Sequence, residues 1–202
     1  AAVERGASLV VGPFSGVADA SAGILIGRSP VLLRDLLGVS GEEWVGLPDA
    51  PTPVTVEEAW TTAPAAVEAS VLGERLRADA ADVLARFGAG HLEGAPAVTR
   101  HRVGGGTAWY LGAVVSDDAL AAVLDDALDA ADVAGVLPDR VLPDDVEAVQ
   151  RGEALFLLNH GDQARGVTLP GPRRDLLSDA DVEGRLTLAP GAAMVLIERH
   201  AE

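Results

Sequence analysis

A serine and an aspartate follow the first apolar run of the chain, where a catalytic group could lie. Leu9–Val11 has the character of a buried strand, and Ser15 and Asp19 come soon after it. Open α/β sheets bind ligands at the carboxyl ends of their strands. A nucleophile elbow, however, requires Gly-x-Ser-x-Gly before a helix, and Pro13 and Val17 occupy the two glycine positions. We therefore predict a turn or capping role for Asp19 and assign no catalytic residue.

The histidines do not have the spacing of a metal site. Zinc-binding motifs place histidines three to five residues apart, or pair them with a nearby glutamate. The four histidines here are far apart in the chain and have no such partner: His91, His101, His160 and His200. The chain contains no cysteine, which excludes thiolate metal sites, disulfides and a cysteine nucleophile. We predict no metal site and no cofactor site.

A glycine run and many carboxylates complete the set of candidate groups. Gly104–Gly106 would need a helix after it to cradle a phosphate, but the strand-like segment 107–114 follows, so we predict a β-hairpin turn. Glycosidase chemistry needs two carboxyl groups that face each other across a sugar. The 31 acidic residues lie mostly where helix starts, helix surfaces and turns are expected, so no catalytic pair is predicted.

Composition limits the class of protein. The chain has 202 residues, of which 49% are hydrophobic and only 3% aromatic, so its core must consist of small aliphatic side chains. Its net charge of −16 argues against nucleic-acid binding and against an anionic membrane surface. No apolar run approaches the roughly 20 residues of a membrane span. No signal peptide is visible in Ala1–Gly6, and we expect a cytoplasmic protein.

The first two thirds of the chain predict an α/β domain, residues 1–140. Pro30–Leu37 predicts a short helix with Val31, Leu32, Leu33, Leu36 and Leu37 on one side and Gly38 at its end. The segment 67–87 is ambiguous, because its composition favours helix but its end alternates like a strand. Asp117–Asp132 predicts a helix capped by Ser116, with an apolar stripe of Leu120, Val123, Leu124 and Leu128. Strands are expected at 8–11, 42–47, 54–58, 95–102 and 107–114.

The segment 143–202 predicts a small antiparallel β-sandwich. Short strand-like runs separated by turn residues recur without any helical pattern. The expected strands are 146–150, 154–159, 166–169, 173–177, 185–188 and 193–198. The domain boundary is therefore expected near 138–145.

Three groups of residues resemble one enzyme family. Phe14–Asp19 with Leu33–Val39, Gly94–Thr99 with Gly104–Gly112, and several runs after residue 146 (Val146–Arg151, Phe156–His160, Asp175–Leu177 and Leu188–Gly191) resemble the family-42 glycoside hydrolases, the bacterial β-galactosidases. The resemblance implies part of a flavodoxin-like, class I amidotransferase-like trimerisation domain followed by the C-terminal β-sandwich. The catalytic TIM barrel, which holds the glutamates that hydrolyse galactosides, would belong to the parent enzyme and is not represented here. Amidotransferase activity would need a cysteine, which is absent.

The resemblance predicts a non-catalytic oligomerisation and accessory region. Ala1–Gly6 has the character of a helix end without a helix start, so we expect a fragment whose half-sheet has an unpaired edge that favours self-association. Two alternatives stay open. One is a carbohydrate-binding β-sandwich, although 143–202 contains neither Trp nor Tyr, and the other is an independent α/β enzyme that uses Ser15 or Asp19.

Overall fold

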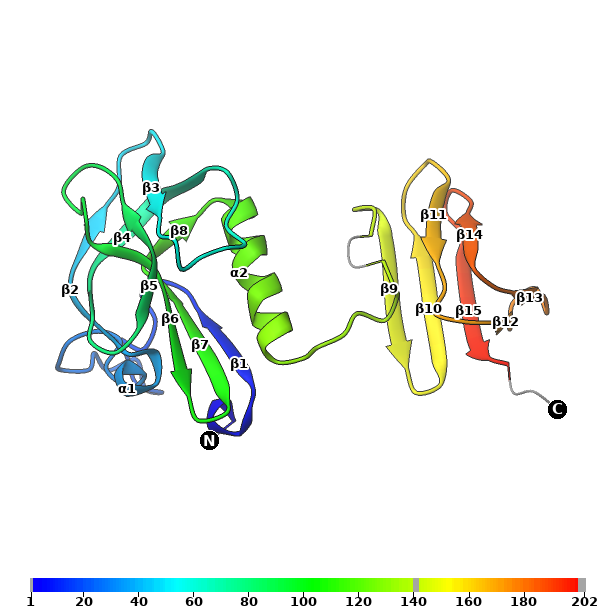
Figure 1. The fold of residues 1–202 in the computed structure, drawn as a ribbon, viewed down its shortest axis with the longest axis horizontal. Helices are drawn as coiled ribbons and strands as arrows, with labels where there is room; N and C mark the ends of the chain where they lie inside the picture. Colours follow the sequence, from blue (N-terminus) through cyan, green and yellow to red (C-terminus); the bar gives the residue numbers. More distant parts are fainter. Residues whose placement is uncertain (1, 140–141, 200–202) are drawn as a thin grey trace. The chain divides into compact units, whose positions relative to one another are not determined.

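The computed structural model describes residues 2–139 and 142–199, which form two compact units, 1–133 and 134–202 (Figure 1). The first unit is built mainly from strands. Its elements in chain order are η1 (Val3–Arg5), β1 (Ser8–Val11), α1 (Arg34–Leu37), β2 (Val39–Gly46), β3 (Thr52–Val56), β4 (Val67–Ala78), β5 (Asp82–Phe87), β6 (Pro96–Val103), β7 (Gly106–Leu111), β8 (Ala113–Val115) and α2 (Asp117–Ala130).

One sheet organises this unit. Its strand order is β1-β7-β6-β5-β3-β4-β2, and β8 pairs with β4. Only the β1–β7 pair is parallel, and the other pairs are antiparallel. The expected α/β class therefore holds only in part, because the sheet is mixed and most of its connections are hairpins or loops instead of crossover helices. In the described residues, β1 pairs on one side only, with β7.

The ambiguous segment 67–87 forms two strands, β4 and β5, and no helix. In β5 the side chains of Leu84, Ala85 and Phe87 are buried in the larger core cluster of this unit. In β4, Val67, Ala69 and Leu76 are also buried. The Ala, Leu, Arg and Glu content favoured helix, but pairing with neighbouring strands on both edges overrides that weak preference.

The helix α2 has the predicted position but buries a different face. Ala119, Val123 and Ala127 are buried, whereas Leu120, Leu124 and Leu128 are exposed. The small residues allow α2 to pack closely on β1 and β7 (Figure 1). The predicted leucine stripe is therefore wrong, except for Val123. Ser116 occupies the N-cap position, but its hydroxyl is buried and makes no capping hydrogen bond.

The predicted helix around Pro30–Leu37 is shorter than expected. The helix α1 begins at Arg34, and Leu32 before it is 67% exposed instead of packed. Gly38 ends the helix with φ 65°, as predicted. A Cβ at this position would lie 2.8 Å from the backbone nitrogen of Ala81 and 2.9 Å from the ring of His101, so both the backbone angle and the available space favour glycine.

The second unit is entirely β in its described part. It contains β9 (Val146–Arg151), β10 (Ala154–Asn159), β11 (Arg165–Thr168), β12 (Arg173–Asp175), β13 (Asp181–Val182), β14 (Arg185–Leu188) and β15 (Ala193–Glu198). A five-stranded sheet has the order β13-β12-β15-β10-β9, and β11 pairs with β14 (Figure 1). All pairs are antiparallel, as expected. Leu155, Leu157 and Leu196 of the larger sheet share one core with Val167 and Leu188 of the smaller. Only β13 was not predicted.

Asn159 at the end of β10 joins two turns of this unit, the one between β10 and β11 and the one between β14 and β15. Its side chain is 2% exposed, and its amide donates to the carbonyls of Gln163 (2.7 Å), Leu188 (3.2 Å) and Ala189 (3.0 Å). Its Oδ1 accepts from the N–H of Gly161 at 3.0 Å. We expect Asn159→Ala to lower the free energy of unfolding of this unit by about 2–3 kcal/mol, because these buried groups lose their partners. Thermal unfolding followed by circular dichroism measures this change. An unchanged transition would contradict it.

Candidate functional site

The structure keeps Ser15 and Asp19 in one loop but does not assemble a catalytic site around them. Asp19 Oδ1 accepts hydrogen bonds from the backbone N–H groups of Ser21 and Gly23, each at 2.8 Å. This is an Asx-type turn, the kind of role predicted for Asp19. The hydroxyl of Ser15 has no hydrogen bond to a histidine or an acid in the described part of the chain. The geometry therefore provides no base to activate it.

The described histidines have separate structural partners. His91 Nε2 lies 3.1 Å from Glu43, His160 Nε2 lies 3.0 Å from Glu147, and His101 Nδ1 lies 3.0 Å from the carbonyl of Leu36. His200 lies outside the described residues. Within 2–139 and 142–199, no cluster of three or more His, Asp or Glu could hold a metal ion. Gly104 and Gly105 form the turn between β6 and β7, so the hairpin prediction is correct. None of the helices described is long and apolar enough to span a membrane.

A buried carboxylate that sequence reasoning missed lies at the centre of the first unit. Glu74 of β4 is 0% exposed. Tyr110 of β7 donates its hydroxyl to the Glu74 carboxylate, with both Oη–Oε distances at 2.9 Å. The backbone N–H of Phe14, which has φ 61°, donates to Glu74 Oε1. Glu74 thus connects β4, β7 and the loop that follows β1. One sequence signal for this burial was available. Glu74 lies two residues before Leu76, and residues two apart on a strand point to the same face of the sheet.

Burial dominates the protonation of this group. Desolvation raises the pKa of Glu74 above its ordinary value, although the hydrogen bonds from Phe14 and Tyr110 act in the opposite direction. Burial and the neighbouring Glu74 charge also raise the pKa of Tyr110. Such shifts occur in catalytic sites, but Glu74 is sealed from solvent, and none of the described groups that interact with it is a second acid. Its role is to hold the loop.

The loop 12–33 held by Glu74 carries the two most exposed large hydrophobic side chains of the described residues, Ile26 and Ile24, and a third exposed one, Leu32. Ile26 is 99% exposed, Ile24 76% and Leu32 67%. Phe14 of the same loop and Trp44 of β2 are also exposed, and their ring centroids lie 5.0 Å apart in an edge-to-face arrangement. Several exposed large apolar side chains on one loop and its neighbouring strand are typical of protein interaction surfaces. We call these five residues the apolar loop surface.

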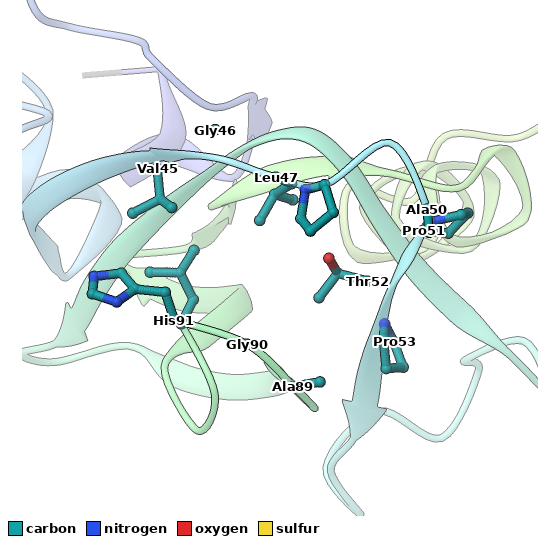
Figure 2. A pocket seen from close by; sticks show the side chains of 12 residues that line it. Val45, Gly46, Leu47, Ala50, Pro51, Thr52, Pro53, Ala89, Gly90 and His91 are labelled. Carbon is teal, nitrogen blue, oxygen red and sulfur yellow. The ribbon is translucent and has the colours of Figure 1, made fainter.

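A pocket of about 360 Å³ lies where the chain passes from β2 to β3. Figure 2 shows segment 45–53 on one side of it and the turn 89–92 on the other, with Val45, Leu47 and Thr52 facing the space. The lining is mostly apolar, and His91 is the one titratable residue among the described lining residues. The pocket can hold a small apolar group, but it contains no acid–base pair for catalysis.

Comparison with known proteins decides the family. The model of the β-galactosidase trimerisation domain matches residues 1–134, and that of the β-galactosidase C-terminal domain matches residues 145–198. This chain belongs to the family-42 β-galactosidases. The resemblance stated from the sequence motifs is thereby confirmed.

Relatives agree with this assignment over nearly the whole chain. β-Galactosidase BglY of Alicyclobacillus acidocaldarius is 35% identical over 206 residues, covering 98% of this chain and 30% of the relative. LacZ of Heyndrickxia coagulans is 32% identical over 198 residues, covering 96% of this chain and 29% of the relative. The crystal structure of the β-galactosidase from Bacillus circulans sp. alkalophilus matches with a TM-score of 0.87 at 26% identity, over 96% of this chain and 29% of that one. The chain thus spans about 30% of the length of the relatives it matches, and the part described contains no TIM barrel.

Proposed function

We propose that this chain is the non-catalytic association and accessory region of a β-galactosidase subunit. The catalysis, hydrolysis of terminal β-galactosides, takes place in a barrel domain outside these residues, and the region described here brings subunits together. The observation that carries this proposal is the apolar loop surface, held in place by Glu74, within a domain that matches the trimerisation model. Trimer formation in the family makes a homotrimer the expected assembly.

Two further features support the proposal. The strand β1 has one unpaired edge in the described residues, and such an edge can recruit another chain. The parallel β1–β7 pair with α2 packed on it is the arrangement expected of a flavodoxin-like layer, so we propose that this part belongs to such a sheet. The domain limits 1–140 and 143–202 and a cytoplasmic location also stand as proposals, the latter supported by the absence of cysteine.

Two measurements on the chain test the proposed function. Sedimentation velocity over a range of protein concentrations should show reversible self-association, and a clean monomer at every concentration would contradict it. A chromogenic β-galactoside should give no hydrolysis above background, because the described residues form no TIM barrel. Clear turnover that co-purifies with the chain would instead favour an independent enzyme.

A further inference from the structure

A second pocket of the first unit, of about 400 Å³, lies between the β6–β7 hairpin and the C-terminal half of α2. Arg100 pairs with Trp109 across the two strands, and Arg102 pairs with Thr107. Residues that pair across antiparallel strands, and residues two apart on one strand, share a face of the sheet. These four side chains therefore form one wall of the pocket. The side chains of α2 that line it are Asp126, Asp129 and Ala130.

The wall formed by the strands contains hydrogen-bond donors without acceptors. Trp109 is 1% exposed, and its Nε1–H has no partner in the described structure. The Nε–H of Arg100 is also buried and unpartnered. Neither Arg100 nor Arg102 forms an ion pair with any residue that the structure describes. Buried donors are nearly always satisfied, and each unsatisfied one costs about 1–3 kcal/mol. Beside these two sealed nitrogens, the remaining N–H groups of the Arg100 and Arg102 guanidinium groups also have no acceptor among the described residues, and both side chains line the pocket.

The acidic residues of the pocket do not supply that acceptor. Asp126 accepts a hydrogen bond from the hydroxyl of Thr62 at 2.7 Å, and Asp129 is also engaged in an interaction of its own. The groups of this pocket that still lack a hydrogen-bond partner are therefore the N–H donors of the guanidinium and indole side chains. A ligand that fits must present oxygen acceptors to the strand wall and keep them away from the two aspartates of α2.

We infer that this pocket binds a single carboxylate group through Arg100 and Arg102. The planar guanidinium fork matches a carboxylate in a bidentate arrangement. A phosphate dianion fits less well, because α2 presents its C-terminal end, the negative end of the helix dipole, and two aspartates to the same space. The glycine turn beside the pocket is followed by a strand, so it provides no helix N-terminus for phosphate. This inference rests on the side chains of this pocket and not on the apolar loop surface, although a carboxylate from a second copy of the chain would be a further contact in self-association.

The carboxylate can come from a small acid in solution or from an acidic side chain of another chain. The indole N–H signal of Trp109 distinguishes these sources in a ¹⁵N–¹H spectrum of the ¹⁵N-labelled chain. We expect a saturable shift of this signal on titration with sodium acetate at constant ionic strength, while the signals of Trp44 and Trp60 stay in place. If the source is another chain, the same signal moves with protein concentration in the absence of acetate.

Matched variants complete the test. Arg100→Gln and Arg102→Gln should each weaken the response about tenfold, and their combination should abolish it. Arg34→Gln, at an exposed position of α1, should bind like the unchanged chain. The unshifted signals of Trp44 and Trp60 report that the variants are folded. No movement of the Trp109 signal with acetate or with protein concentration would overturn the inference, as would a response to phosphate or galactose alone.

Discussion

Replacing Glu74 with alanine should lower the free energy of unfolding of the first unit by about 3 kcal/mol, because the Tyr110 hydroxyl and the Phe14 N–H lose a buried acceptor. Glu74→Gln should cost about 1 kcal/mol or less, since its amide oxygen still accepts one of these bonds. Urea unfolding followed by tryptophan fluorescence measures the change in this unit alone, because Trp44, Trp60 and Trp109 all belong to it. Equal stabilities for the alanine variant and the unchanged chain would refute this role for Glu74.

Comparing the unchanged chain with Glu74→Gln at several pH values also reports the protonation state of Glu74. Since burial raises its pKa in the folded state, the folded chain binds this proton more tightly than the unfolded chain does. The stabilisation is then fully present below the ordinary pKa of 4.5 and is lost as the pH rises through the raised value. We expect the stability of the unchanged chain relative to Glu74→Gln to decrease across this window. A difference that increases with pH would mean that the hydrogen bonds outweigh desolvation.

Placing aspartates at the tip of the apolar loop should abolish self-association. Ile24 and Ile26 are so exposed that Ile24→Asp with Ile26→Asp should leave the unfolding transition nearly unchanged. In an interface each isoleucine would contribute roughly 1.5–3 kcal/mol of burial energy, and each aspartate would add a desolvation cost. Sedimentation velocity should therefore show a monomer at concentrations where the unchanged chain associates.

A matched control distinguishes association through this surface from nonspecific hydrophobic association. Leu176 and Leu177 of the second unit are also exposed, at 53% and 63%, but they lie outside the apolar loop surface. Leu176→Asp with Leu177→Asp should leave association unaltered if the loop is the contact. If both double variants lose self-association equally, the association is nonspecific apolar contact. If the loop variant still self-associates, another surface, such as the edge of β1, makes the contact.

The sequence predicted those features that depend on neighbouring residues. The strands 154–159, 185–188 and 193–198 have the expected bounds, because each is a short apolar or alternating run between turn residues. Gly38 and the hairpin at Gly104 were found for the same reason. The family was recognisable because its motifs recur in order along the chain.

Features that depend on distant contacts were missed. Glu74 meets Tyr110 and Phe14, which are 36 and 60 positions away, so no local pattern shows that its carboxylate is satisfied inside a core. In α2, the series Ala119–Val123–Ala127 and Leu120–Leu124–Leu128 have the same spacing. Hydrophobicity favours the leucines, but the close approach of the helix to β1 and β7 selects the smaller residues. The donors around Trp109 arise in the same way, from the meeting of a hairpin and a later helix.

The parallel pairing of β1 with β7 sets an order of events during synthesis. Most neighbours in the first sheet are close in sequence and can pair as they leave the ribosome, whereas β1 at Ser8–Val11 must wait for Gly106–Leu111. About 100 residues separate the two strands, which corresponds to roughly 5–20 s of translation. Tyr110, the partner of Glu74, arrives with the same strand. Until first Glu74 and then Tyr110 have been synthesised, the loop 12–33 lacks its complete anchor, so this is the period in which chaperone binding would matter most.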